Sequence, residues 1–382
     1  MKIICCKSDD AYAEQAFRLR YDVFVNEMGY LIDNVDHERG IDRDEIDAFS
    51  NIYVVIDEGR VVATARIVYS KDCDLSNLIS KELADGWEID DFLEHFPKLV
   101  AVSTKFAILP EYRGTLAAIR LTSKIYQDML RDGTAFLFSI CSPSMIELYQ
   151  QLAFRFYAPA YADAIGVTIP IVQTVNDWDY MAEIKSPLLK SIGNLKRNAD
   201  QEKSVDWFYH KFGKNLDVFI RDVKEEEISN AIENHIARSK HAEKDVFFGM
   251  SSADMRIFLS ECKIMQYRQN QVIFKAGQQE EDLFLLLEGA VQIFAGDSIG
   301  ENYVLASGDV FGEEELCQKR RRTCTSLALS DSKIIVISRN IINRLSKKNP
   351  ELMGQFFMNL GMRRAMRQHI QHQKMSQAAL LP

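Results

Sequence analysis

The sequence lacks any long apolar run and any N-terminal signal. No hydrophobic stretch approaches the ~20 residues that a membrane-spanning helix needs. The N-terminus holds one short apolar run, Ile3–Cys6, and then acidic side chains, which is not the pattern of a signal peptide. These absences argue against channels and favour a cytoplasmic protein with no membrane span.

Cysteine is scarce and follows no pattern. The chain has 7 cysteines, without the paired spacing of a disulfide framework or a zinc site. Cys5 and Cys6 are adjacent, which is too close for ordinary disulfide geometry. His37 and His95 lie far apart in the sequence. We therefore predict reduced thiols, as in cytoplasmic proteins, and no bound metal.

An excess of positive charge is also missing. The chain has 46 Lys and Arg against 55 Asp and Glu, a net charge of −9. This balance argues against a general nucleic-acid binder, although the sequence does not exclude local basic patches. At 382 residues, with 47% hydrophobic and 26% charged side chains, the chain has ordinary globular composition and enough length for two domains.

What the sequence does contain is most informative at residues 311–324. Gly312 beside the acidic Glu313 suits a tight turn into a short helix, whose backbone N–H groups can hold a phosphate. Arg322 follows nine residues after Glu313 and can close over that phosphate. Glu313 can accept hydrogen bonds from sugar hydroxyls. Together these groups suit a cyclic ribose phosphate; the alternative is a surface turn followed by a basic run.

This stretch resembles the phosphate-binding cassette of cyclic-nucleotide-binding domains. The shared pattern is Phe-Gly-Glu, two residues, Leu, five residues, Arg and then Thr, with Glu315 and Arg321 where the family usually has Ala and Pro. A hydrogen bond from a guanine amino group to the residue after the Arg would favour cGMP over cAMP. The resemblance implies that cAMP or cGMP would be bound by Gly312, Glu313, Glu314, Arg322 and Thr323.

The residues around the cassette fit the same kind of domain. Short strands separated by Gly turns predict a β-barrel or jelly roll. Glu-Gly-x-Val at 288–291 and Gly-Asp-x-Phe-Gly-Glu at 308–313 also resemble this family. A last helix at 352–372 would be the lid, and only a short polar tail follows it, so we expect no DNA binding. Three basic side chains of this helix either reach the pocket or form a solvated face: Arg363, Arg364 and Arg367.

The first 180 residues contain an ordered series of strands and helices. Two strands flank Asp57-Glu58-Gly59 and predict a β-hairpin. An acidic stretch at 31–49, without a clear period, predicts a long ordered loop. Beyond the hairpin the pattern predicts a strand at 99–108, a turn at 109–114, a helix at 115–131, a strand at 135–140 and a short helix at 144–152.

This series resembles the GCN5-related N-acetyltransferase (GNAT) fold over roughly residues 10–175. In that family the strand before the turn and the strand after the helix splay apart, and a thioester donor inserts between them. The resemblance implies that the turn at Arg113 and Gly114 donates backbone N–H groups to a pyrophosphate at a helix start. Leu116 stands where the family pattern has a glycine.

The front of this region has a finer resemblance, to acyl-homoserine-lactone synthases and the related N-acyl amino acid synthases. The first branch has a tryptophan where this chain has Tyr30, and a Glu and an Arg on the later strand that are not both present here. We therefore favour the second branch, which joins an acyl chain to an amino acid amine. Its donor would be acyl carrier protein or a coenzyme A thioester. The resemblance is carried by Arg20, Phe24, Tyr30, Asp44, Asp47, Arg66 and Ser103.

Acyl transfer from a thioester needs a proton donor and a stabilised carbonyl oxygen. Tyr149 sits where many family members place a tyrosine that protonates the leaving thiolate; the alternative is that it packs the short helix. A backbone N–H near Phe106 to Ile108, at an expected strand bulge, could polarise the carbonyl. Ser103 lies on the same strand.

The acceptor amine would be held by charged side chains. Asp44 and Asp47 could orient the amine or relay its proton through water; the alternative is a solvated loop. Arg20 and Arg66 could bind an acceptor carboxylate in bidentate pairs. The alternative for both arginines is an internal ion pair with the acidic loop.

Together these patterns predict an α+β protein in three parts. Residues 1–180 would form a GNAT-like N-acyltransferase domain, 181–244 a helical connector, and 245–382 a cyclic-nucleotide-binding β-barrel or jelly roll with flanking helices. The predicted function is transfer of an acyl group to an amine, controlled by a cyclic nucleotide. The alternatives are a cyclic-nucleotide-regulated protein lysine acetyltransferase that uses acetyl-CoA, and a catalytically inactive binding protein. The oligomeric state is left open, with a dimer as one option.

Overall fold

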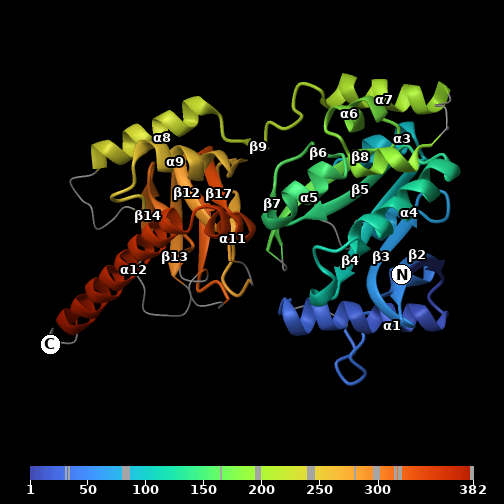
Figure 1. Cartoon of the computed structure of the whole chain (residues 1–382), viewed down its shortest axis with the longest axis horizontal. Helices are drawn as coiled ribbons and strands as arrows, with labels where there is room; N and C mark the ends of the chain where they lie inside the picture. Colours follow the sequence, from blue (N-terminus) through green and yellow to red (C-terminus); the bar gives the residue numbers. More distant parts are fainter. Residues whose placement is uncertain are drawn as a thin grey trace. The chain divides into compact units, whose positions relative to one another are not determined.

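The structure, a computed structural model, divides the chain into two compact units, Met1–Val218 and Phe219–Pro382 (Figure 1). In the described ranges no helix combines the length and the apolar character that crossing a membrane requires. In the same ranges no group of three His, Cys, Asp or Glu side chains is placed to hold a metal ion. The structure describes residues 1–30, 32, 35–79, 87–163, 166–193, 199–238, 246–278, 281–295, 302–313, 316 and 321–378.

The first unit is built on a sheet with the strand order β1-β2-β3-β4-β5-β8-β6, and β7 pairs with β8. The predicted hairpin forms between β2 and β3, where Glu58 and Gly59 both have positive φ, as a tight two-residue turn requires. β4 and β5 run parallel, so a helix connects them. The strands are β1 (Lys2–Cys6), β2 (Asn51–Asp57), β3 (Arg60–Tyr69), β4 (Val100–Ile108), β5 (Phe136–Cys141), β6 (Phe154–Phe156), β7 (Tyr161–Asp163) and β8 (Gly166–Thr174).

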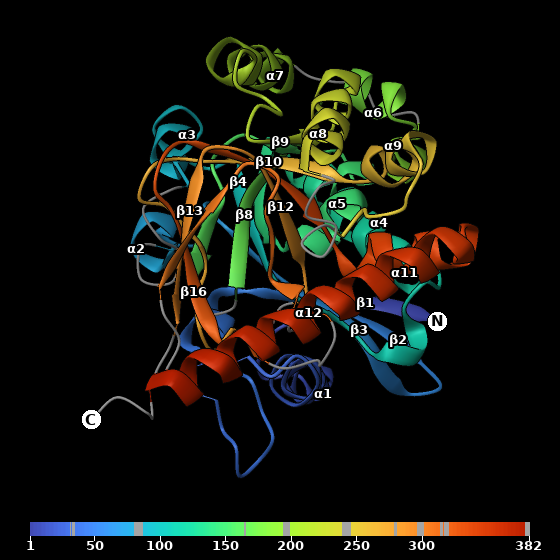
Figure 2. The same cartoon turned by 90° about the vertical axis from the view of Figure 1, so that its left-hand side faces the viewer.

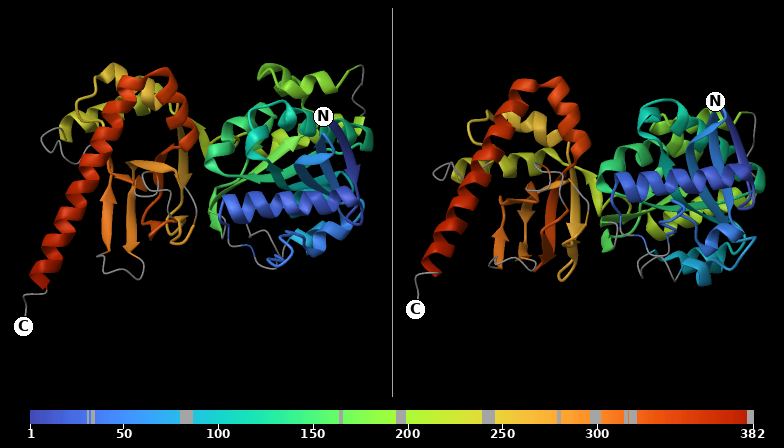
Figure 3. Two further views of the ribbon diagram at one scale, coloured as in Figure 1. Left: turned by 60° about the horizontal axis from the view of Figure 1, so that its bottom comes forward. Right: turned by 90° about the horizontal axis from the view of Figure 1, so that it is seen from below.

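The helices α1 and α4 pack on this sheet through their apolar residues. α1 (Ala11–Arg20) lies along the sheet and buries Ala13, Ala16 and Phe17 (Figures 1 and 3). It continues directly into a π-helix, η1 (Tyr21–Glu27). The other helices are η2 (Glu45–Phe49), α2 (Leu75–Ile79), α3 (Ile89–His95), η3 (Pro110–Tyr112), α4 (Ala117–Asp132), η4 (Pro143–Met145), α5 (Ile146–Gln151), α6 (Trp178–Glu183), η5 (Pro187–Ser191) and α7 (Ala199–Phe212).

The second unit is a sandwich of two sheets of short strands with flanking helices, which agrees with the jelly roll of the expected β-barrel or jelly roll. One sheet has the order β15-β12-β17-β10-β9 and the other β11-β16-β13-β14. Figure 2 shows α8 (Glu225–Arg238) and α9 (Ser252–Ser260) together at one end of the strands. The strands are β9 (Ile220–Asp222), β10 (Lys263–Tyr267), β11 (Val272–Phe274), β12 (Leu283–Glu288), β13 (Ala290–Ala295), β14 (Tyr303–Ala306), β15 (Val310–Phe311), β16 (Cys324–Ala328) and β17 (Ser332–Ile337).

Two C-terminal helices complete this unit, α11 (Arg339–Lys348) and α12 (Pro350–Ala378). The first turns of α12 bury Met353, Phe356 and Leu360 in the core. The ring of Phe356 lies 4.8 Å from the ring of Phe258 in α9, measured between centroids. Figure 3 shows that α12 then runs past the strands of its own unit to the C-terminus.

The turn between β12 and β13 requires its glycine. Gly289 has φ +97°. A Cβ at this position would lie 2.3 Å from Ser332 Oγ and 2.6 Å from the carbonyl oxygen of Asp331. Any side chain would therefore push β12 away from β17 at the start of the Glu-Gly-x-Val motif.

The structure divides residues 181–244, expected to be a helical connector, between the two units. α7 contributes Phe208 and Phe212 to an aromatic cluster of the first unit, where Phe212 stacks 5.3 Å from Phe92. β9 pairs with β10, and α8 buries Ile228 in the second core. The apolar faces of these helices therefore belong to two cores and not to a free-standing spacer.

Candidate functional site

Two central strands of the first unit separate partway along their length. β4 pairs with β5 only over Val100–Val102. Farther along, between Thr104 and Ala107, β4 holds one residue more than the matching part of β3, which makes a β-bulge. Lys105 lies in this bulge with φ +53°. The bulge expected near Phe106 thus changes the course of β4 where its pairing with β5 has ended.

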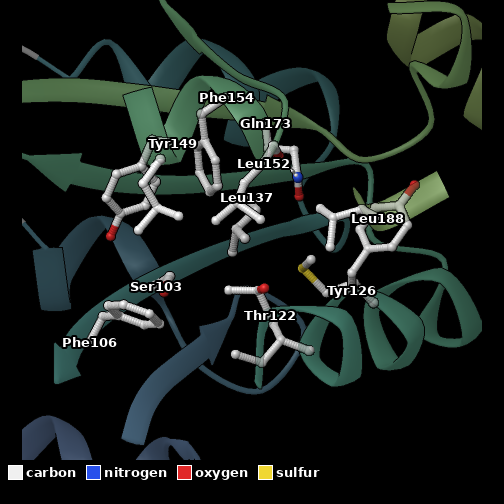
Figure 4. A pocket seen from close by; sticks show the side chains of 13 residues that line it. Ser103, Phe106, Thr122, Tyr126, Leu137, Tyr149, Leu152, Phe154, Gln173 and Leu188 are labelled. Atoms are coloured by element: carbon white, nitrogen blue, oxygen red, sulfur yellow. Dashed lines mark hydrogen bonds between the residues drawn. The ribbon is translucent and has the colours of Figure 1, made fainter. Parts of the chain in front are cut away.

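A small cavity of about 30 Å³ lies where β4 and β5 separate. Such a volume holds roughly one or two water molecules. Figure 4 shows three of the predicted site residues, Ser103, Phe106 and Tyr149, at the same end of it. The rest of the wall is mainly apolar and comes from α4, α5, β5, β6, β8 and η5.

Tyr149 lies in α5, half-buried, with its ring edge-on to Phe154 at 5.1 Å between centroids. Burial, and then the nearby thiol of Cys141, raise the pKa of this phenol well above its ordinary value, while a hydrogen bond with Ser139 opposes the rise. The phenol therefore stays protonated across the neutral range and can donate a proton. Tyr149 packs against Phe154 and also lines the cavity, so its packing does not remove the phenol from the predicted site.

Arginines and aspartates among the predicted residues of the first unit pair with one another in buried salt bridges. Arg20 and Asp47, both without exposed side-chain surface, form a salt bridge of 2.8 Å. Arg66 binds Asp44, lies 3.6 Å from Asp47, and donates from Nε to Thr104 Oγ1 at 2.8 Å. The internal pairing with the acidic loop is thus what the structure shows for both arginines. The solvated-loop alternative does not hold for Asp47.

Asp44 is the N-cap of η2 and begins a capping box. Its Oδ1 accepts from the backbone N–H groups of Ile46 at 3.0 Å and Asp47 at 3.3 Å, and its own N–H donates to Asp47 Oδ2 at 3.1 Å. Burial disfavours the charged carboxylate, but the guanidinium of Arg66 and the ammonium of Lys105 hold the pKa of Asp44 below its ordinary value. The carboxylate is therefore ionised and fixed in direction.

Lys105 joins this cluster through the bulge. Its Nζ lies 3.0 and 3.1 Å from the carboxylate oxygens of Asp42 and 4.0 Å from Asp44. Nζ also lies 6.0 Å from the ring centre of Phe24, which stacks on Tyr30 at 6.2 Å. The predicted residues Phe24, Tyr30 and Asp44 are thus brought together, and Asp42 is a member that the sequence did not single out. The density of acids at 36–47 was the available signal.

The turn after β4 is held by Arg113. This side chain binds Glu27 in a bidentate pair of 2.5 and 2.6 Å and donates twice to the carbonyl oxygen of Ile108 at 3.1 Å. Gly114 has φ +74°, whereas Leu116 has the right-handed helical φ of −73°. The backbone therefore does not demand the family's glycine at position 116. The Leu116 side chain is 57% exposed at the start of α4.

The cassette of the second unit folds around Arg322. Its guanidinium lies 4.3 Å from the ring centre of Phe274 and donates to the carbonyl oxygens of Gly312 at 3.2 Å and Asp282 at 2.7 Å. Gly312 has φ +83°, and a Cβ there would lie 2.7 Å from Arg322 Nη1. Burial raises the pKa of the Asp282 carboxyl to about 6, although the charge of Arg322 opposes this rise.

Glu313, the expected sugar-binding carboxylate, meets the lid helix. The carboxylate is buried and lies 3.5 Å from Nε of Arg363 in α12. Arg363 also donates to the carbonyl oxygen of Val310, and only 6% of it is exposed. Of the two alternatives for the lid arginines, Arg363 therefore reaches the cassette.

The remaining predicted residues are placed as follows. Thr323 is exposed at the end of the cassette. Glu314 and Glu315 lie outside the described residues, as do the side chains of Arg364 and Arg367.

Two family models match this chain. Residues 19–123 match the acetyltransferase (GNAT) domain, and residues 264–349 match the cyclic nucleotide-binding domain. The chain thus combines an N-terminal GNAT domain with a C-terminal cyclic-nucleotide-binding domain. The matched ranges contain the bulge of β4 and the described part of the cassette.

Similar proteins were found for each part. The cAMP-activated global transcriptional regulator CRP of Pasteurella multocida is 30% identical over 110 residues, 28% of this chain and 53% of the relative. The cyclic AMP receptor protein of Thermus thermophilus is 26% identical over 108 residues, 28% of this chain and 50% of the relative. The chain spans about half the length of these curated relatives. A solved CoA-dependent acyl-homoserine lactone synthase, BjaI, is 15% identical with a TM-score of 0.38, and the likeness covers 53% of this chain and 98% of that chain.

Proposed function

We propose that this chain is an N-acyltransferase that moves an acyl group from a thioester to an amine, and that a cyclic nucleotide bound to the second unit regulates it. The observation that carries the first part is the convergence of Tyr149, Ser103 and the β4 bulge on one cavity in a GNAT domain. The observation that carries the second is the buried Arg322 beside Gly312 in a cyclic-nucleotide-binding domain.

In this proposal the thioester carbonyl lies against the bulge. A backbone N–H of the bulged segment hydrogen-bonds the carbonyl oxygen, which gains charge as the amine attacks. Tyr149 then donates its proton to the sulfur of the departing thiolate, because its raised pKa keeps it protonated. The donor is a coenzyme A thioester or an acyl carrier protein.

The charged cluster would hold the acceptor. Arg20, Asp47 and Arg66 are 0–1% exposed, so they act by positioning Asp44. Asp44 and Lys105 keep 19% and 16% of their side chains exposed, so they are the members that an acceptor can touch. A carboxylate beside an ammonium matches the two charges of an amino acid, which is the acceptor we propose.

Transfer of an acetyl group is the second candidate, and the small volume of the cavity favours it. The two candidates differ in donor. If acetyl-CoA supports turnover and long-chain acyl carrier protein does not, the acetyl reading replaces the first.

The decisive experiment is an assay of the purified full chain. A panel of acetyl, butanoyl and decanoyl thioesters is combined with amino acids, thiol release is recorded, and the product is identified by mass spectrometry. An acylated amino acid supports the proposal. Absence of product from every thioester, with and without cAMP or cGMP, would leave a binding protein as the function.

Regulation would use the contact between Glu313 and Arg363. A ribose hydroxyl that donates to Glu313 competes with Arg363 for the same carboxylate. The phosphate of the nucleotide then accepts hydrogen bonds from the guanidinium of Arg322, in place of the carbonyl oxygen of Gly312. Binding would thus release α12 from the cassette. In this proposal the ribose displaces Arg363 from Glu313, so nucleotide binding and the lid contact compete.

A further inference from the structure

A buried amide in the cavity of the first unit has one acceptor atom left over. Gln173 lies in β8, opposite Leu137 of β5 and Phe154 of β6, and is 1% exposed. Its Nε2 donates to the carbonyl oxygen of Leu152, which fixes which end of the amide is which. Among the described residues, no group donates to its Oε1.

This acceptor faces the cavity. Gln173 is one of the residues that line it, and Figure 4 shows the end of its side chain directed into the space between Leu152 and Leu188. The sequence around it is otherwise apolar, Ile169-Pro-Ile-Val-Gln173, as a buried strand should be. A glutamine here costs free energy unless something donates a hydrogen bond to it.

The other hydroxyl groups deep in the cavity do not serve as that donor. The hydroxyl of Thr122 donates to the carbonyl oxygens of Ala118 at 2.9 Å and Ile119 at 3.1 Å. The phenol of Tyr126 donates to the carbonyl oxygen of Val175 at 2.7 Å. Among the buried polar atoms of the described residues that line the cavity, Gln173 Oε1 is the one without a hydrogen-bond partner, and it requires a donor.

We propose that Gln173 selects an acyl group that carries a hydroxyl. A hydroxyl supplies one donor and fits an otherwise apolar wall, whereas an ammonium would bring a charge that this wall cannot solvate. The inference rests on the proposed acyltransferase function and adds the substrate class. Acyl chains without a hydroxyl would leave Oε1 unsatisfied and bind less well.

The test compares matched pairs of donors with the full chain. The pairs are butanoyl-CoA with 3-hydroxybutanoyl-CoA and decanoyl-CoA with 3-hydroxydecanoyl-CoA, so chain length is not assumed. We expect kcat/KM to favour the hydroxylated member of at least one pair by about tenfold. Equal kcat/KM within both pairs would overturn the inference while leaving the acyltransferase function standing.

Two variants sharpen the test. Gln173→Met keeps the length of the side chain but removes the acceptor oxygen. The ratio of kcat/KM for the hydroxylated donor to that for the plain donor should therefore fall to about one. Thr122→Val removes a hydroxyl that is already bonded to its own helix, so the preference should persist. If the preference survives Gln173→Met, Gln173 is not the selecting residue.

A binding measurement covers the case in which Gln173→Met does not fold. Calorimetry on the wild-type chain compares decanoate with 3-hydroxydecanoate, and we expect tighter binding of the hydroxylated acid. Equal affinity would contradict the inference, because a cavity water would then satisfy Oε1. Absence of turnover with every thioester would count against the proposed function. The calorimetric comparison would still test whether Gln173 favours a hydroxylated acyl chain.

Discussion

At the scale of single residues, the charged cluster of the first unit separates support from contact. Arg20 and Asp47 are sealed off, whereas Asp44 and Lys105 reach solvent. A buried pair is costly to break, because the remaining partner keeps its charge without water. Substitutions in this cluster should therefore fall into two groups, one acting on stability and one on turnover.

Asp47→Asn should lower the free energy of unfolding of the first unit by about 3–5 kcal/mol, because it leaves Arg20 charged and buried. Denaturant unfolding followed by circular dichroism measures this. Replacing both partners, as Arg20→Met with Asp47→Leu, should recover part of the loss, because the double variant still lacks the carboxylate that accepts from the Asp44 N–H and lies 3.6 Å from Arg66. A double variant as unstable as the single one would show that the pair does more than neutralise itself.

Tyr149→Phe should lower kcat by about 10²-fold with little change in KM, because the thiolate then leaves without its proton donor. The matched control is Tyr126→Phe, which removes a cavity hydroxyl bonded to a backbone carbonyl and should leave kcat near wild type. Since the pKa of Tyr149 is raised, its ionisation should not reduce the rate below about pH 10. Equal kcat in both variants would remove Tyr149 from the mechanism.

Asp282 gives the second unit a pH dependence of definite sign. Its folded pKa of about 6 lies above the ordinary 3.8, so the folded state binds the proton more tightly than the unfolded state. The free energy of unfolding should therefore fall as pH rises from about 4 to 6 and then level off. Thermal unfolding across that range checks this, and Asp282→Asn should flatten the curve. A rise in stability over the same window would contradict the assignment.

At the scale of elements, the sequence predicted the regular parts well and the irregular parts poorly. The hairpin of β2 and β3 and the helix α4 follow from local patterns that tertiary contacts do not override. The π-helix after α1 leaves no signature in the hydrophobic pattern, and Arg363 could not be assigned because its partner Glu313 lies far away in the sequence. Gln173 was missed because one polar residue in a buried strand is not a motif.

Because the cassette contacts α12, substitutions of Arg322 and Arg363 should change the Kd for the cyclic nucleotide in opposite directions. Arg322→Ala should raise the Kd for cAMP or cGMP by about 100-fold, because it removes the phosphate partner. Arg363→Met should lower the Kd several-fold, because Glu313 is then available to the ribose. Calorimetry measures both. Arg321→Ala is the control, since that side chain bonds the carbonyl oxygen of Gly277 and should leave the Kd unchanged.

At the scale of the whole molecule, the boundary between the two units decides how the chain can be cut. The pattern of charge and helix suggested a connector at 181–244, but pattern alone does not say which core a helix serves. Fragment 1–218 keeps Phe208 and Phe212 and should unfold cooperatively, whereas 1–180 loses them and should not. Circular dichroism melts distinguish the two. Equal melting of both fragments would show that α7 is dispensable.

The three residues of β9 have a further consequence, for solubility. They cover the outer edge of β10 by pairing along Lys263–Met265. An uncovered strand edge offers free N–H and C=O groups to another molecule and promotes aggregation. A fragment of the second unit that starts at residue 245 would expose that edge, whereas one that starts at Phe219 would keep β9 and so keep the edge covered.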